Sequence, residues 1–285
     1  MRFELAASGR SVKYLKYVKT SRGRVAYADR GRGQAVVLIH GSVSDLRIWR
    51  SIFPALARHY RVIAYSRRHH RPNPPPFDEY SFVRDVDDLA EVLRALAISA
   101  AHFVAHSAGG YVVVEFAKRY PEKTISLSLF DANARGLLTG PKATVVSSEL
   151  EKWLGPVRSF LAAGDDRRAM RCLLEPLFQG TKLPKWFLSM ANENIDSLKR
   201  QFASTLPLPS INCAQFRRYP GSTLVLQGEH SPHPFKTVNE AFHRCARNAQ
   251  FKTIERCGHI FQVDAPAKVL ERIMQFFNTQ YNENF

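Results

Sequence analysis

One eight-residue stretch, 103–110, constrains the fold of this chain more than any other part of the sequence. It reads FVAHSAGG, so an apolar run ends abruptly at Ser107 and a helix-like pattern follows at once. A serine held on a sharp turn between a strand and a helix needs very small residues two positions before and two positions after it. Ala105 and Gly109 occupy those positions. The stretch predicts a nucleophile elbow; the alternative is a plain strand–turn–helix with an incidental serine.

Strand-like and helix-like patterns alternate on both sides of this stretch. Residues 12–18 alternate apolar and basic side chains, and a turn at 22–23 leads into a second short run, which predicts an antiparallel hairpin at a sheet edge. Continuous apolar runs predict buried strands at 35–39, 61–65, 124–130, 223–226 and 251–254, with helical periodicity between them. We therefore expect an α/β fold with a mostly parallel, doubly wound sheet of eight strands flanked by helices.

The alternation breaks between residues 132 and 221, where three helical patterns appear and no convincing strand does. The first is centred near Leu150, the second follows the N-cap candidate Asp165, and the third runs from Phe187 to Phe202 as one helix. We expect an α/β core formed by 1–131 and 222–285, with 132–221 inserted after the sixth strand as a helical cap, or lid.

Composition narrows the classes of function. The net charge is +16, but the basic residues are scattered, and 67–71 is their only dense cluster. Scattered charge is typical of a solvated surface and favours acidic substrates or nonspecific polyanion contacts. No nucleic-acid module is recognisable, so no specific nucleic-acid partner is expected. No apolar run approaches the ~20 residues of a membrane span, so none is expected.

The cysteines and the N-terminal residues bear on the compartment. Four widely spaced cysteines without a C-x-x-C pair predict reduced, mostly buried thiols and no metal site: Cys172, Cys213, Cys245 and Cys257. The first 20 residues are basic but lack a continuous apolar segment. We expect a cytoplasmic protein, with a cleaved organellar presequence as the alternative, and either a monomer or a homodimer.

Four short motifs, in their order along the chain, resemble those of the α/β-hydrolase superfamily. They are HGS at 40–42, HSAGG at 106–110, GEHS at 228–231 and CGH at 257–259. The resemblance spans about residues 20–280 and depends on order and spacing, because each motif alone is weak. It implies a cofactor-free hydrolase with a small-molecule substrate, in which Ser107 is the nucleophile. His259, between the last strand and the final helix, would be its general base.

The carboxylate that would orient His259 has two candidates. In many relatives the acid stands three residues after the glycine that ends the penultimate strand, but here that position is Ser231. A second placement, at the end of the strand before the lid, holds Asp131, which keeps the order Ser, Asp, His along the chain. We favour Asp131 and keep Glu229 as the alternative acid. A missing acid, in a crippled or repurposed protein, is the third reading.

The remaining site residues follow from the same resemblance. An oxyanion hole needs two backbone N–H groups, for which Ser42 and Ala108 are the candidates. The loop after Tyr65 departs from the D-x-R-G-x-G run common in relatives. Its Arg68 and His70 are candidate substrate contacts, although a solvated basic loop explains them equally well. Aromatic residues on the inserted helices suggest a partly apolar or aromatic substrate, although most such residues are core; the candidates are Trp153 and Trp186.

These observations predict an enzyme that acts on a carboxylic ester or related acyl substrate. Ser107 would attack the carbonyl carbon, and water would resolve the acyl-enzyme with the help of His259. The alternatives are a C–C bond hydrolase or a lactonase with the same triad. A degenerate hydrolase that serves as a ligand receptor is a further alternative, because fold alone does not settle function.

Overall fold

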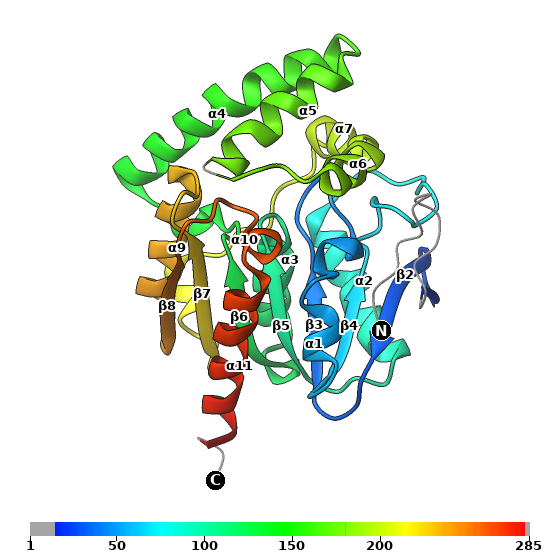
Figure 1. The fold of residues 1–285 in the computed structure, drawn as a ribbon, viewed down its shortest axis with the longest axis vertical. Helices are drawn as coiled ribbons and strands as arrows, with labels where there is room; N and C mark the ends of the chain where they lie inside the picture. The colour runs from blue at the N-terminus through cyan, green and yellow to red at the C-terminus, as the bar shows by residue number, and fades with distance from the viewer. Residues whose placement is uncertain (1–14, 180, 283–285) are drawn as a thin grey trace.

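Eight strands form one continuous sheet in the computed structural model, which describes residues 15–179 and 181–282 (Figure 1). Their order is β1-β2-β4-β3-β5-β6-β7-β8, and only the β1–β2 and β2–β4 pairs are antiparallel. The predicted mostly parallel eight-stranded sheet is therefore confirmed. The strand bounds are Lys16–Thr20, Gly23–Arg30, Ala35–Ile39, Arg61–Tyr65, Ala101–His106, Thr124–Phe130, Ser222–Gly228 and Ala249–Ile254, for β1 to β8 in chain order.

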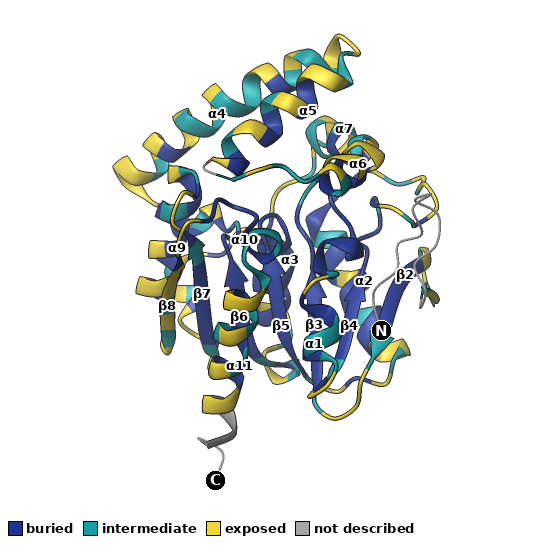
Figure 2. Ribbon diagram, in the orientation of Figure 1, coloured by how far each residue is buried: buried dark blue, intermediate teal, exposed yellow. Residues whose placement is uncertain are grey.

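Helices cover both faces of this sheet, and the alternation of side chains along each strand explains why. In β3, Val37 and Ile39 belong to one apolar cluster and Val36 and Leu38 to the other. The first cluster is completed by α2 (Phe82–Ala95), α3 (Gly109–Arg119) and α9 (His233–Cys245), and the second by α1 (Phe53–Leu56) and α11 (Pro266–Asn282). The central strands are buried throughout, whereas α9 and α11 expose their outer sides (Figure 2).

Between β6 and β7 the chain forms a run of helices that we call the helical segment (residues 132–221). Most of it lies above the sheet in Figure 1, on the side where the site described below is found. Its helices are α4 (Gly140–Ala162), α5 (Asp166–Leu174), α6 (Lys185–Glu193), α7 (Ile195–Ala203) and α8 (Cys213–Phe216).

The single helix expected from Phe187 to Phe202 is wrong, because the chain breaks at Asn194 between α6 and α7. The Asn194 side-chain amide donates to the Met190 carbonyl at 2.9 Å and to the Asp45 carboxylate at 2.9 Å. Its oxygen accepts the Arg71 N–H at 2.8 Å. Side-chain bonds of this kind compete with helix continuation, and here they also attach the helical segment to loops of the sheet.

The prediction of four reduced thiols is wrong for one pair. Cys213 in α8 and Cys245 in α9 form a disulfide, while Cys172 and Cys257 are free. The wide spacing of the cysteines in the sequence gave no sign of this pairing. The disulfide removes one argument for a reducing compartment, and the cytoplasmic location stays a prediction. Part of the first predicted strand, residues 12–14, lies outside the described residues. Across the described chain, no helix is long and apolar enough to cross a bilayer.

Candidate active site

Ser107 sits on a sharp turn between β5 (Ala101–His106) and α3. Its φ of +52° is uncommon for a residue with a side chain. Two glycines make room for the turn. A Cβ on Gly109 would lie 2.7 Å from the Ile39 carbonyl oxygen, and one on Gly41 would lie 2.8 Å from the Ser107 Cβ. The small residues in the sequence therefore correspond to close backbone approaches around this serine.

His259 lies in the loop between β8 and α10 (Phe261–Asp264), and three contacts hold its imidazole and backbone. The Phe235 ring stacks on the imidazole with centroids 4.0 Å apart. The His259 N–H donates to the Leu177 carbonyl at 3.0 Å, and the His259 carbonyl lies 3.1 Å from His106 Nε2. The side chain is 1% exposed, so its position is set by packing.

Asp131, directly after β6, is the carboxylate that meets this histidine. Its Oδ2 lies 3.1 Å from His259 Nδ1 and also accepts a hydrogen bond from the Ser231 hydroxyl. Its Oδ1 accepts from the Asn239 amide at 2.7 Å. The alternative acid, Glu229, is turned away: its side chain is 47% exposed and accepts the Arg256 N–H at 2.7 Å. The position at which a carboxylate was first sought, Ser231, thus supplies a donor to the carboxylate on the neighbouring strand.

Burial shifts the protonation equilibria of this pair in opposite directions. It raises the pKa of Asp131 to about 7, while the hydrogen bonds from Ser231 and Asn239 act to lower it. Burial also lowers the pKa of His259 well below its usual range. A neutral imidazole can accept a proton, and a carboxylate at Nδ1 fixes the tautomer that leaves Nε2 unprotonated.

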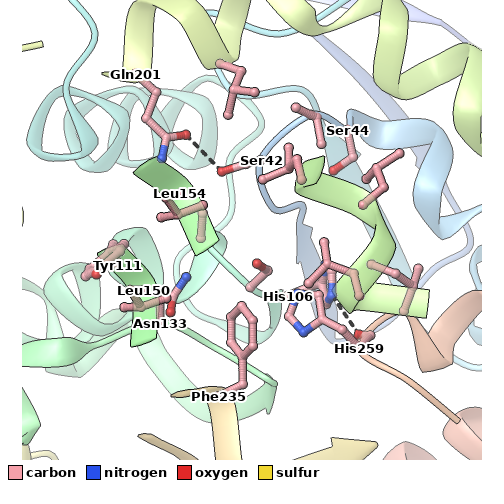
Figure 3. Close-up of a pocket in the computed structure, with 18 of the residues that line it drawn as sticks. Ser42, Ser44, His106, Tyr111, Asn133, Leu150, Leu154, Gln201, Phe235 and His259 are labelled. Carbon is pink, nitrogen blue, oxygen red and sulfur yellow. Dashed lines mark hydrogen bonds between the residues drawn. The ribbon is translucent and has the colours of Figure 1, made fainter. Parts of the chain in front are cut away.

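Ser107 and His259 open into a cavity of about 130 Å³ between the strand ends and the helical segment (Figure 3). Most of its wall is apolar, and the helical segment supplies most of the apolar residues: Leu150, Trp153, Leu154, Leu173, Leu174, Leu177, Phe187, Leu198, Phe202 and Leu208. Of the predicted aromatic contacts, Trp153 lines the cavity. Trp186 does not, because its ring packs under the Arg50 guanidinium at 4.8 Å.

Both predicted oxyanion residues, Ser42 and Ala108, line the cavity. Within the described residues, neither of their backbone N–H groups donates to another protein group. The Ser42 hydroxyl donates to the Gln201 side-chain oxygen at 2.8 Å, which ties the loop after β3 to α7 (Figure 3). That hydroxyl therefore already has an acceptor, and the free donor at Ser42 is its backbone N–H.

The expectation that Arg68 and His70 reach the pocket is wrong. Arg68 is buried and donates to Asp88 in α2 and to the Thr20 hydroxyl, the latter at 2.8 Å. His70 is 2% exposed, with its ring 4.6 Å from the His40 ring. Neither lines the cavity. Two arginines of this basic cluster, Arg67 and Arg68, are therefore paired with buried carboxylates inside the protein.

A feature of the sequence that we did not use indicates that these arginines are buried in ion pairs. Asp85 and Asp88 lie three residues apart beside the apolar stripe of α2, and both are almost fully buried. Buried carboxylates require partners, and Arg67 and Arg68 are the partners. Arg67 also donates its backbone N–H to His40 Nε2 at 2.9 Å. The loop thus braces the His40–Gly41 turn beside Ser107.

Sequence reasoning also missed five polar residues on the cavity wall: Ser44, Tyr111, Asn133, Arg135 and Gln201. Tyr111 had a signal, since it falls in the first turn of α3, directly after the elbow that carries Ser107. Asn133 and Arg135 follow Asp131 closely. No local pattern marks Gln201.

Comparison with known proteins identifies the family. Residues 36–272 match the model of the alpha/beta hydrolase family. The chain belongs to this family. Among curated relatives, a fluoroacetate dehalogenase from Burkholderia sp is 30% identical over 106 residues, 35% of either chain. Epoxide hydrolase 1 from Caenorhabditis elegans is 24% identical over 92% of this chain and 70% of its own. The chain spans only 32–43% of the length of the first relatives it matches.

Solved structures of the same fold include enzymes with several activities. Est816, described as an N-acyl homoserine lactone degrading enzyme, superposes with a TM-score of 0.75 at 21% identity, covering 92% of this chain and 100% of its own. Naproxen esterase from Bacillus subtilis gives a TM-score of 0.72 at 19% identity, covering 92% and 90%. At these identities the likeness establishes the fold, and the chemistry has to be argued from the site.

Proposed function

We propose that this protein is a serine hydrolase of small carboxylic esters or related acyl compounds, with Ser107, His259 and Asp131 as its triad. The observation that carries the proposal is the 3.1 Å contact between His259 Nδ1 and Asp131, with Ser107 opening into the same cavity as His259. Membership of a hydrolase family and the free N–H groups at Ser42 and Ala108 support it further.

In the proposed reaction, His259 accepts the Ser107 hydroxyl proton as the oxygen attacks the substrate carbonyl. The Asp131 carboxylate accepts a hydrogen bond from Nδ1–H of His259, keeps the productive tautomer and stabilises the imidazolium that forms, without taking up the proton itself. The Ser42 and Ala108 N–H groups stabilise the oxyanion. His259 then returns the proton to the leaving group, and a water molecule, activated by the same imidazole, releases the acid from Ser107.

A serine nucleophile separates this chain chemically from the activities named for two of its relatives. A serine oxygen that displaced a halide or opened an epoxide would form an alkyl ether. Such an ether has no carbonyl for water to attack, so Ser107 would be blocked after one turnover. An acyl ester on Ser107 is readily hydrolysed. We therefore propose acyl chemistry, and lactones belong in the same substrate panel as open-chain esters.

We further propose that residues 1–131 and 222–285 form the catalytic core and that the helical segment is its cap. It supplies most of the apolar side chains on the cavity wall, so an apolar or aromatic substrate part is expected to pack there against residues such as Trp153. By excluding water, such a wall strengthens every polar interaction at the reacting carbon.

Hydrolysis of short p-nitrophenyl esters by single variants tests the assignment. We expect Ser107→Ala to lower kcat by about 10⁶-fold and Asp131→Asn by about 10⁴-fold. Glu229→Gln is the matched control, because its carboxylate contacts only exposed groups, and its kcat is expected to stay within about twofold of the parent. Activity that survives in Ser107→Ala, or equal slight losses in the two carboxylate variants, would refute the triad.

A further inference from the structure

One permanent charge lies on the wall of the otherwise largely apolar cavity. Among the described residues that line it, only Arg135 carries a lysine, arginine or carboxylate charge. Arg135 stands four residues after Asp131, in the connection between β6 and α4. Arg135 is exposed to solvent and also lines the cavity. An apolar pocket gains orientation and specificity from a few well-placed polar groups, so a lone guanidinium on its wall indicates what part of a ligand it would bind.

One contact of Arg135 and one contact of its loop tie this residue to the elbow and to α3. Its Nε donates to the Tyr111 hydroxyl at 2.9 Å, and Tyr111, one turn after Ser107 in α3, is 6% exposed. Two residues before Arg135, the Asn133 N–H donates to the Ser107 carbonyl at 2.8 Å. The loop that carries the guanidinium is therefore anchored to the elbow itself (Figure 3 shows Tyr111 and Asn133 on one side of the cavity).

The positive charge of Arg135 is not cancelled by the protein. Across the described residues, no carboxylate lies within ion-pair distance of its guanidinium, and Nη1 and Nη2 have no protein hydrogen bond. A second cavity of about 300 Å³ shares Arg135, Phe82, Leu150 and Gln201 with the first. Its other charged wall residues, Arg158 and Glu151, pair with each other.

We propose that Arg135 binds an anionic group of the substrate, so that the preferred substrates are acyl compounds with an apolar body and a carboxylate or similar anion. The guanidinium offers its two terminal nitrogens to the two oxygens of such a group, while Tyr111 fixes Nε. The substrate anion would lie at the junction of the two cavities, with the scissile carbonyl at Ser107. This inference rests on the proposed function and adds the substrate class to it.

Kinetic selectivity between matched substrates tests the inference. One pair is p-acetoxybenzoate and its neutral methyl ester; the other is the p-nitrophenyl monoester of a long dicarboxylic acid and that of the monocarboxylic acid of equal length. The two pairs place the anion on the leaving group and on the acyl group respectively. In Arg135→Gln we expect the ratio of kcat/KM, anionic over neutral, to fall about tenfold for at least one pair.

Two further variants separate a local contact from a general charge effect. Arg167→Gln, on the exposed side of α5 and outside the active-site cavity, removes the same unit of charge and should leave the ratio unchanged. Arg135→Lys keeps the charge but not the fork and should restore part of the ratio. Equal ratios in the parent and Arg135→Gln, or an equal loss in Arg167→Gln, would overturn the proposal.

A binding measurement keeps this test separate from the test of hydrolysis. Calorimetric titration with 4-phenylbutyrate and with its neutral amide needs no turnover. We expect Arg135→Gln to weaken binding of the acid about tenfold and to leave binding of the amide unchanged. Loss of ester hydrolysis in the parent would refute the proposed function, whereas unchanged affinity for the acid in Arg135→Gln would refute the role of Arg135.

Discussion

At the scale of single residues, two neighbouring strands contribute to the acid of the site: a carboxylate follows β6, and a hydroxyl that donates to this carboxylate follows β7. Asp131 follows β6, and Ser231, at the position where a carboxylate was first sought after β7, donates to the same Oδ2 that contacts His259. Asn239 satisfies the other oxygen at 2.7 Å. Hydrogen bonds to an ionised carboxylate favour its charged form, so both side chains oppose the effect of burial on the pKa of Asp131. They are positioning residues for the proposed acid.

Ser231→Ala is expected to shift the pH profile of kcat/KM more than it lowers the maximal value of kcat/KM. Burial raises the pKa of Asp131 to about 7, so the carboxylate is protonated below that pH and kcat/KM falls as the pH is lowered. Loss of the Ser231 donor raises this pKa further. The acidic limb of the kcat/KM profile should therefore move to higher pH.

Ser231→Thr is the matched control, because it keeps the hydroxyl, and its profile should follow that of the parent. A limb at the same pH in Ser231→Ala and Ser231→Thr would contradict the role of Ser231. A uniform fall in kcat without a shift of the limb would point to a packing role instead.

The site residues that could be predicted from the sequence are those marked by the residues next to them. Ser107 is marked by its small neighbours, Asp131 by the end of an apolar run, and His259 by a glycine before a Pro-started helix. Arg68 and His70 had no such marker: their environment depends on Asp88 and His40, which lie 20 and 30 residues away. The sequence shows where a charged side chain occurs, but whether this side chain faces a pocket depends on the distant residue with which it pairs in the fold.

At the scale of elements, strands and long helices were predictable and the break between α6 and α7 was not. The periods of two and 3.6 residues are properties of the apolar pattern itself. Asn194 ends α6 through contacts with Asp45 and Arg71, which no helical pattern encodes. The same contacts attach the helical segment to the loops that follow β3 and β4.

Asn194→Ala should loosen this attachment. The variant loses three hydrogen bonds of a side chain that is 2% exposed, and we expect about 2 kcal/mol of destabilisation. The thermal unfolding midpoint should fall by several degrees, which a thermal unfolding experiment measures. Asn192→Ala, on the exposed side of α6, is the matched control and should leave the midpoint unchanged. Equal midpoints for both variants would show that Asn194 does not anchor the helical segment.

At the scale of the whole molecule, the disulfide closes a large loop of the chain. Cys213 and Cys245 are separated by 32 residues, and the loop between them contains β7, Ser231 and most of α9. A cross-link stabilises a protein mainly by restricting its unfolded state, by an amount that grows slowly with loop length. It also joins the end of the helical segment to the helix that carries Phe235 and Asn239.

Removing the cross-link with Cys213→Ser and Cys245→Ser together is expected to cost about 3–4 kcal/mol of stability. The unfolding midpoint of the parent should drop on treatment with a reductant, whereas that of the double variant should not respond. Cys172→Ser is the control, because that thiol is free. A parent midpoint that is insensitive to reductant would contradict the predicted contribution of the disulfide.

The order in which the proposed triad occurs along the chain has a consequence for synthesis. The strands that carry Ser107 and Asp131 pair directly with each other and precede the helical segment, whereas His259 follows the last strand of the sheet. Translation therefore completes the nucleophile and the acid long before the base. A nascent chain would hold a serine without its proposed proton acceptor until β8 and the loop with His259 behind it have emerged and β8 has paired with β7.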